Sequence, residues 1–227
     1  MNIYDILSQA RDFDQNVNVV EADNLFWRYA SCHMNVARNY TSGCLAAGVK
    51  VCQQRRIQAV KLIRLDVSLL DKLFQELPNL HVIYQYRDPR GILASRFANA
   101  RRLATHRFEK ETKILCANML HDVNVTETLS AAYPGRVIFM RFEDIAMNPA
   151  AESARVYSLL GETVPPEVTS WLSSATANEN SADRPFDTVR ADSTKIPLAW
   201  QRTLNSKQID VVNELCQDFI LKMNYTL

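Results

Sequence analysis

The segment Val82-Ile-Tyr-Gln-Tyr-Arg-Asp-Pro-Arg-Gly-Ile-Leu-Ala-Ser-Arg96 has the pattern of a buried strand, a tight turn and the start of a helix. A helix that begins after a strand presents free backbone N–H groups and a positive end to an anion. Three arginines, Arg87, Arg90 and Arg96, surround that point together with Ser95. Because a planar guanidinium group suits phosphate better than an ammonium group does, the segment predicts a phosphate site, with a nucleotide as the expected ligand.

The stretch from Arg87 to Arg96 resembles the segment that binds the nucleotide 3′-phosphate in carbohydrate sulfotransferases, the lumenal Golgi enzymes of glycosaminoglycan, keratan and chondroitin type. These enzymes sulfate sugar hydroxyls with 3′-phosphoadenosine 5′-phosphosulfate as the donor. The family has an arginine at the strand end and a serine eight residues later, and Arg87 and Ser95 match that spacing. The resemblance therefore implies a nucleotide co-substrate and a glycan acceptor, with Arg87 and Ser95 on the 3′-phosphate; Arg90 is expected beside them.

A solvated surface turn is the alternative interpretation of the same residues. Arg-Asp-Pro occurs in many surface turns, where the aspartate caps and the proline fixes the backbone. Taken alone, Arg87-Asp-Pro-Arg90 fits that description. The strand before it, the helix after it and Ser95 at the family's offset favour the phosphate site.

A second segment, Arg141-Phe-Glu-Asp-Ile-Ala-Met-Asn-Pro149, resembles the Arg-Tyr-Glu-Asp-Leu-x-x-Asn-Pro segment of the same family. The tyrosine of that segment lies near the adenine in related sulfotransferases. The resemblance places Phe142 at that position, without the hydroxyl. An architectural role is the alternative, because Glu143 and Asp144 favour a helix N-terminus through capping and the helix dipole.

The C-terminal part offers further contacts for the nucleotide. Ser193-Thr194 followed by Trp200 resembles a Ser-Thr then Trp-Arg segment of the family. A glutamine follows Trp200 here, and the arginine, Arg202, comes one residue later than in the family's segment. Arg190 and Lys195 lie in the same loop and could close over the nucleotide.

Several other charged residues have open assignments. Lys61 and Arg64 lie in an apolar run, so they either face a sulfate group or extend to the rim of the sheet. A basic cluster is interpreted as a solvated helix face or as a groove for an acidic glycan; it comprises Arg101, Arg102, His106 and Arg107. The general base is not identified, and the side chains considered for it are His106, Glu109 and Glu143.

Length and composition set the limits of the interpretation. A chain of 227 residues suffices for one α/β domain, and a net charge of +1 gives no bias toward nucleic acid or membrane. The five glycines do not cluster, which excludes a Walker-type phosphate loop and with it a P-loop kinase. No metal is expected. The sequence contains no leader or membrane span, so we expect membrane contact only through an N-terminal anchor outside this chain.

The five cysteines do not have the spacing of a zinc site. Cys32, Cys44 and Cys52 lie within one stretch of 21 residues and favour a disulfide. Unpaired buried thiols are one interpretation of Cys116 and Cys216. The odd count leaves at least one cysteine unpaired.

Three Asn-X-Thr sequons, at Asn39, Asn124 and Asn224, are acceptor sites for N-glycosylation. Sequons of this kind also arise by chance, so they give weak support for secretion. Together with the resemblance to a Golgi family, they predict that the full-length parent protein resides in the Golgi lumen.

The periodicity of the chain predicts an α/β fold. Strands are expected at 58–65, 82–86 and 136–141, and helices are expected at 66–77, 91–105, 108–133, 149–160, 165–171 and 207–223, the first capped by Asp66 and the last by Ser206. Such alternation predicts a three-layer arrangement, a parallel sheet flanked by helices, and the resemblance implies the P-loop nucleotide-hydrolase-like sulfotransferase fold. Residues 1–227 are expected to form one domain, with residues 1–54 irregular or helical.

One part of the family's site has no counterpart in this sequence. The resemblance covers roughly residues 55–225, whereas the family also has a first strand and a Ser/Gly-rich loop that holds the 5′-phosphosulfate; the segments 31–35 and 41–44 do not match that loop. We therefore expect a domain truncated at its N-terminus that lacks this strand and loop. The expected function is sulfuryl transfer to a carbohydrate hydroxyl; the alternative is a non-catalytic homologue or fragment that binds nucleotide or glycan without turnover.

Overall fold

The structure is a computed structural model that describes residues 56–63, 65–99, 107–178 and 189–227. The chain divides into two compact units, residues 1–65 and residues 66–227, and the second carries the elements below. Several residues singled out from the sequence lie outside the described part: Cys32, Asn39, Cys44, Cys52, Arg64, Arg101, Arg102 and His106.

Two strands, β1 (Val82–Tyr86) and β2 (Val137–Arg141), form a parallel pair in the described part of the chain, as predicted. Their register runs from Val82 opposite Val137 to Tyr86 opposite Arg141. The predicted strand at 58–65 is wrong for the residues that are described there, since 57–63 and 65 form neither strand nor helix and the side chains of 57–63 are exposed. An apolar run becomes a strand only where a neighbour pairs with its backbone, and the run itself does not specify that neighbour.

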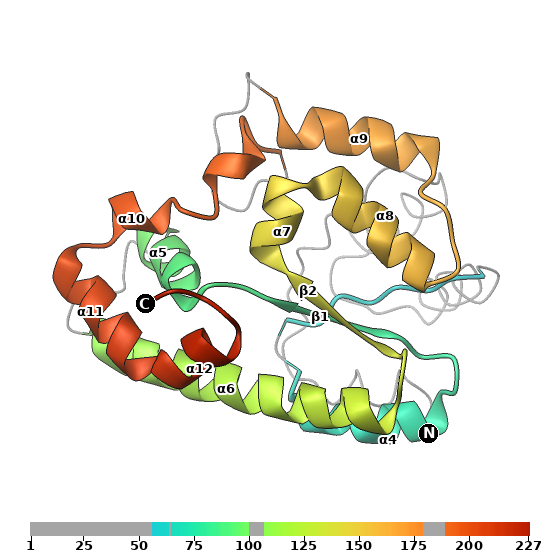
Figure 1. Cartoon of the computed structure of the whole chain (residues 1–227), viewed down its shortest axis with the longest axis horizontal. Helices are drawn as coiled ribbons and strands as arrows, with labels where there is room; N and C mark the ends of the chain where they lie inside the picture. Colours follow the sequence, from blue (N-terminus) through green and yellow to red (C-terminus); the bar gives the residue numbers. More distant parts are fainter. Residues whose placement is uncertain (1–55, 64, 100–106, 179–188) are drawn as a thin grey trace, which may run out of the picture. The chain divides into compact units, whose positions relative to one another are not determined.

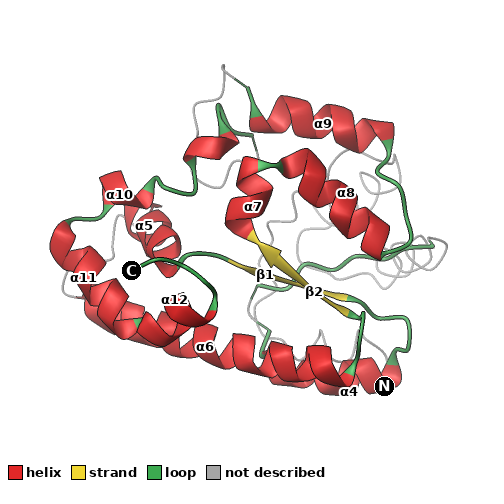
Figure 2. Cartoon of the chain, in the orientation of Figure 1, coloured by secondary structure: helices red, strands yellow, loops and turns green. Residues whose placement is uncertain are grey.

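Helices cover the sheet on both sides, which confirms the predicted α/β class with a parallel sheet flanked by helices. Figures 1 and 2 show α6 along one side with α11 and α12 against it, and α7, α8 and α9 on the other side. The helices are η1 (Val67–Leu69), α4 (Leu70–Glu76), α5 (Pro89–Asn99), α6 (Phe108–Ala132), α7 (Phe142–Met147), α8 (Pro149–Leu159), α9 (Pro166–Thr176), η3 (Ser193–Lys195), α10 (Trp200–Thr203), α11 (Ser206–Leu215) and α12 (Gln217–Lys222).

The helix boundaries follow local capping chemistry. Asp66 caps η1 as predicted, because its carboxylate accepts the backbone N–H of Ser68 at 3.0 Å. The predicted cap at Ser206 is wrong. Asn205 caps α11 instead, in a reciprocal capping box with Gln208. The single final helix that was predicted is divided at Cys216 into α11 and α12.

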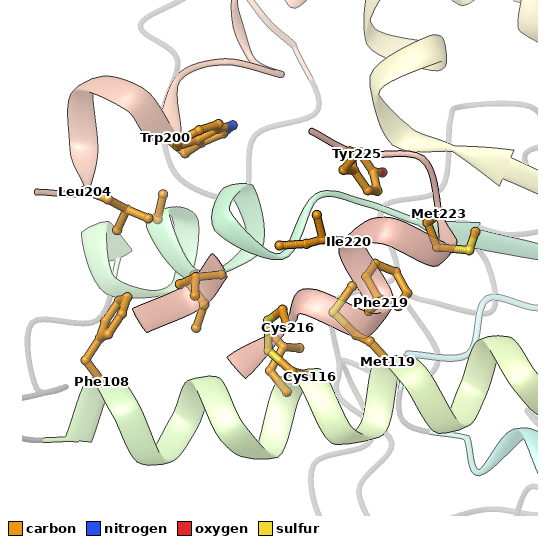
Figure 3. Packing of buried hydrophobic residues seen from close by; sticks show 14 of the residues in the cluster. Phe108, Cys116, Met119, Trp200, Leu204, Cys216, Phe219, Ile220, Met223 and Tyr225 are labelled. Atoms are coloured by element: carbon orange, nitrogen blue, oxygen red, sulfur yellow. A yellow bond between two sulfur atoms is a disulfide. The ribbon is translucent and has the colours of Figure 1, made fainter. Parts of the chain in front are cut away.

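A buried cluster between α5, α6 and the C-terminal helices forms the core of this unit (Figure 3). Val123 from α6 and Val212 from α11 have no exposed surface, and a disulfide joins Cys116 of α6 to Cys216. The interpretation of these two cysteines as unpaired thiols is therefore wrong. The Cα atoms of Cys116 and Cys216 lie 5.0 Å apart because α11 and α12 pack against α6. The two cysteines are 100 residues apart in the chain, so the sequence does not indicate that they are close in space.

No helix in the described ranges is long and apolar enough to cross a membrane.

Candidate anion-binding site

The candidate site lies at the edge of the sheet where both strands end. Tyr86 is paired with Arg141, so the next residues, Arg87 and Phe142, leave the sheet side by side. Ligands of parallel α/β sheets bind at this edge. Two residues after Arg87, Pro89 begins the eleven-residue helix α5 with the fixed φ that suits a first helical turn.

Arg87 is held between a glycine and an aromatic ring. Its Cζ atom lies 4.1 Å from the centroid of the Phe142 ring, in cation–π geometry. On the other side it runs along Gly91, where a Cβ atom would approach Nε to 2.9 Å. Only glycine leaves room for the guanidinium group in this position. Ser95 follows Gly91 by one helical turn, so its exposed hydroxyl lies on the same face of α5.

The charge of Arg87 is incompletely compensated. Burial lowers the pKa of its guanidinium group, the carboxylates of Glu143 and Asp88 raise it, and the positive charge of Arg190 lowers it again. Its buried Nε–H has no hydrogen-bond partner among the described residues. A desolvated guanidinium group with a free donor and a second arginine nearby is an arrangement that an anion would stabilise.

Arg90 has a different environment, although it belongs to the same motif. The side chain of Arg90 is 5% exposed and that of Asp88 is 7% exposed. Nε and Nη2 of Arg90 donate to the carboxylate of Asp88. Nη1 donates to Asn213 at 3.3 Å, and Nη2 also donates to the backbone carbonyl of Thr226 at 2.8 Å. Arg90 also lies over the ring of Trp200. The interpretation of Arg-Asp-Pro-Arg as a solvated surface turn is therefore wrong, and Arg90 is bound by the protein itself.

Glu143 connects the two strand ends. Its Oε1 accepts the backbone N–H of Asp88 at 3.0 Å, and its Oε2 accepts the hydroxyl of Tyr225 at 2.8 Å. An ion pair with Arg141 at 3.5 Å adds to these contacts. Both oxygens of Glu143 are therefore engaged by Asp88 and Tyr225. The capping role predicted for Glu143 is not observed, because α7 has no side-chain hydrogen bond at its N-cap. Glu109, also considered as a base, lies exposed in the first turn of α6.

The C-terminal segment carries a mixture of structural and exposed residues. Ser193 is buried, and its hydroxyl donates to the carbonyl of Ala146 in α7. Lys195 is exposed and pairs with Asp192 at 3.1 Å, and Arg202 is exposed as well. Of the loop residues predicted to approach the nucleotide, Arg190 is the one whose charge acts on Arg87.

A cavity of about 300 Å³ adjoins the motif on the side of Arg90. Its lining includes Asp88, Glu143, Trp200 and Tyr225. The indole N–H of Trp200 is buried and has no partner in the described structure, and Figure 3 shows its nitrogen on the side that faces Tyr225. The roles of Gly91 and Tyr225 could not be predicted from the sequence, because they depend on contacts made across the fold.

Lys61 is exposed in the first unit. Within the described residues there is no group of three or more His, Cys, Asp or Glu side chains that could hold a metal ion.

An arginine beside a helix N-terminus, at the carboxyl edge of parallel strands, is an arrangement in which α/β domains bind nucleotide phosphates. Residues 5–224 match the family profile described as "Sulfotransferase domain", and the chain belongs to this family. The match begins well before residue 55, where the resemblance of the motifs starts.

Carbohydrate sulfotransferases are among the similar curated proteins. Carbohydrate sulfotransferase 1 of Danio rerio is 30% identical over 198 residues, which cover 80% of this chain and 47% of that protein. Carbohydrate sulfotransferase 4 of Mus musculus is 24% identical, with coverage of 78% and 50%. Carbohydrate sulfotransferase 1 of Homo sapiens is 26% identical, with coverage of 81% and 48%. The chain thus spans about half the length of these relatives, and no solved structure matches it significantly.

Proposed function

We propose that the chain is the nucleotide-anchoring part of a carbohydrate sulfotransferase, which moves a sulfuryl group from 3′-phosphoadenosine 5′-phosphosulfate to a sugar hydroxyl. The family membership and the names of the relatives support the reaction class. The observation that carries the assignment of the site is Arg87, a desolvated arginine with an unpartnered Nε–H, fixed between Gly91 and Phe142.

In this proposal the 3′-phosphate lies against the first turns of α5. Arg87 donates to it and Arg190 adds positive charge, while the hydroxyl of Ser95 donates from the next turn of the helix. Phe142 supports Arg87 with one face, and the rest of its ring is the proposed contact for adenine. Arg90 stabilises the turn between β1 and α5 through its hydrogen bonds to the carboxylate of Asp88.

The transfer itself is mostly positioning and charge neutralisation, as in phosphoryl transfer. The sugar hydroxyl attacks sulfur in line, and a new S–O bond forms while the S–O bond to the 5′-phosphate breaks. Adenosine 3′,5′-bisphosphate leaves, and a side-chain base takes the hydroxyl proton. In this proposal the described residues bind the nucleotide part of the donor while its sulfuryl group is transferred.

Calorimetric titration with adenosine 3′,5′-bisphosphate tests the anchor. We expect the wild-type chain to bind it and Arg87→Ala to bind about 10- to 150-fold less tightly, since charge-assisted hydrogen bonds contribute about 1.5–3 kcal/mol. Adenosine 5′-monophosphate is the matched control ligand, because it lacks the 3′-phosphate and its affinity should not depend on Arg87. Equal affinity of wild type and variant for the bisphosphate would refute the site.

A transfer assay with radiolabelled sulfate donor and a panel of glycosaminoglycans tests the reaction. Turnover that is lost in Arg87→Ala supports the proposed enzyme. Binding of nucleotide without turnover on any glycan would favour the alternative, a non-catalytic homologue or fragment.

We also propose that the parent protein resides in the Golgi lumen. The buried Cys116–Cys216 disulfide is typical of an oxidising compartment, and the sequon asparagines Asn124 and Asn224 are both exposed. Expression behind a secretory signal sequence should give a chain whose gel mobility increases on treatment with an N-glycosidase. An unchanged mobility would remove this support.

A further inference from the structure

The last residues of the chain reach the turn that carries Arg87. After α12, Asn224 adopts a left-handed φ of 56°, a conformation that asparagine tolerates better than most residues. The backbone N–H of Tyr225 then donates to the carbonyl of Ile220 at 2.9 Å, in the pattern of a Schellman helix end. This reversal directs Tyr225 and Thr226, together called the C-terminal clip, toward the sheet edge.

The clip holds Asp88 by two separate routes. In the first, the hydroxyl of Tyr225 donates to Glu143, whose other oxygen accepts the backbone N–H of Asp88. In the second, the carbonyl of Thr226 accepts a hydrogen bond from Arg90, which chelates the carboxylate of Asp88. Asp88 directly follows Arg87, so both routes end one residue from the arginine that carries the site.

The environment of Tyr225 preserves this connection. Tyr225 is 6% exposed, and burial, followed by the charge of Glu143, raises the pKa of its hydroxyl, so the group remains a donor at neutral pH. Its ring packs under the guanidinium group of Arg141 at 4.1 Å and edge-on against Tyr86. The ring therefore contributes packing, and the hydroxyl contributes the link to Glu143.

We propose that the C-terminal clip is a positioning element of the nucleotide site, with Tyr225 as its principal residue. It fixes the backbone at Asp88 and thereby the direction in which Arg87 leaves β1 toward the 3′-phosphate. This inference rests on the proposed function, because it assumes a nucleotide at Arg87. According to this inference, nucleotide binding also requires residues outside the Arg87–Ser95 motif. Thr226 of the clip lies 136 residues after Arg90 in the chain.

Tyr225→Phe tests the clip with little change in packing, and Tyr133→Phe is its matched control. The hydroxyl of Tyr133 also donates to a carboxylate, that of Asp71, at the same distance of 2.8 Å but on α4, away from the site. The measurements are the melting temperature and the calorimetric affinities for adenosine 3′,5′-bisphosphate and adenosine 5′-monophosphate. We expect Tyr225→Phe to weaken binding of the bisphosphate about tenfold, equivalent to about 1.4 kcal/mol, and Tyr133→Phe to leave it unchanged.

The two ligands separate positioning from general damage. A loss confined to the bisphosphate supports the inference, because only that ligand depends on the direction of Arg87. An unchanged bisphosphate affinity in Tyr225→Phe, even with a lower melting temperature, overturns the inference alone, and so does an equal loss for both ligands. Absence of binding to the wild-type chain overturns the proposed function and the inference together.

Discussion

Replacing Gly91 by alanine tests how Arg87 is held. The added Cβ would lie 2.9 Å from Nε, 3.2 Å from Nη2 and 3.4 Å from Cζ of Arg87. The first of these distances requires movement, and the atoms concerned are the end of a flexible side chain rather than backbone. We therefore expect the guanidinium group to swing away while α5 keeps its course. Because alanine is favoured over glycine in a helix, the free energy of unfolding should stay unchanged or rise by up to about 1 kcal/mol.

The expected loss of binding follows from what Arg87 supplies. A displaced guanidinium group gives up charge-assisted hydrogen bonds to the phosphate, about 1.5–3 kcal/mol. It also leaves the ring of Phe142, which removes about 0.5–1 kcal/mol of the interaction that holds it in place. The lost hydrogen bonds alone should lower the affinity for adenosine 3′,5′-bisphosphate by about 10- to 150-fold, at about 1.4 kcal/mol per tenfold change.

Calorimetry and urea unfolding on Gly91→Ala provide the two measurements, and Arg87→Ala completes a double-mutant cycle. If the methyl group acts only by moving Arg87, the double variant should bind no more weakly than Arg87→Ala. Two results would refute the reasoning. One is wild-type affinity in Gly91→Ala, and the other is a loss of stability as large as the loss of binding energy, which would indicate damage to α5.

Three further variants address stability. Replacing both Cys116 and Cys216 by serine should lower the free energy of unfolding by about 3–5 kcal/mol in urea titrations, since the disulfide closes a loop of about 100 residues; no loss would mean that the thiols are unpaired. Arg90→Ala should cost about 3–5 kcal/mol because it leaves Asp88 buried without its partner, and a fully stable variant would contradict this. Arg136→Ala removes the side chain that donates to the carbonyls at the end of α4, so the variant should lose about 2 kcal/mol of stability and melt at a lower temperature. An unchanged melting temperature would show that water replaces the guanidinium group as the donor.

The sequence predicted those parts of the fold that depend on local patterns. The apolar runs of β1 and β2 lie beside clear helix signals, and the break at Pro134-Gly135 separates α6 from β2. Gly135 has a φ of 77°, a conformation that suits glycine, so this break could be located from residue type alone. The place of Arg87 in the chain, between β1 and α5, could be predicted as well, because it depends on the strand before it and the helix after it, whereas the direction of its side chain depends on Phe142.

Features that depend on distant contacts could not be predicted in the same way. The run at 58–65 is as apolar as a true strand, but a strand also needs a partner. The pairing of Cys116 with Cys216 follows from helix packing and not from spacing. The environment of Arg90 depends on Asn213 and Thr226, which lie 123 and 136 residues later in the chain.

The contrast between the two arginines of the motif shows what makes one of them available to a ligand. A guanidinium group has five N–H donors, and burial is favourable only when most of them are satisfied. At Arg90 carboxylate, amide and carbonyl oxygens meet this need, so an incoming phosphate would have to displace protein partners. At Arg87 the partner is an aromatic ring, which attracts the charge but leaves the buried Nε–H without a hydrogen-bond partner among the described residues. In the proposed site an anion would satisfy the donor that the free protein leaves without a partner at Arg87, so the alanine variant of Arg87 should separate binding from folding as Arg90→Ala cannot.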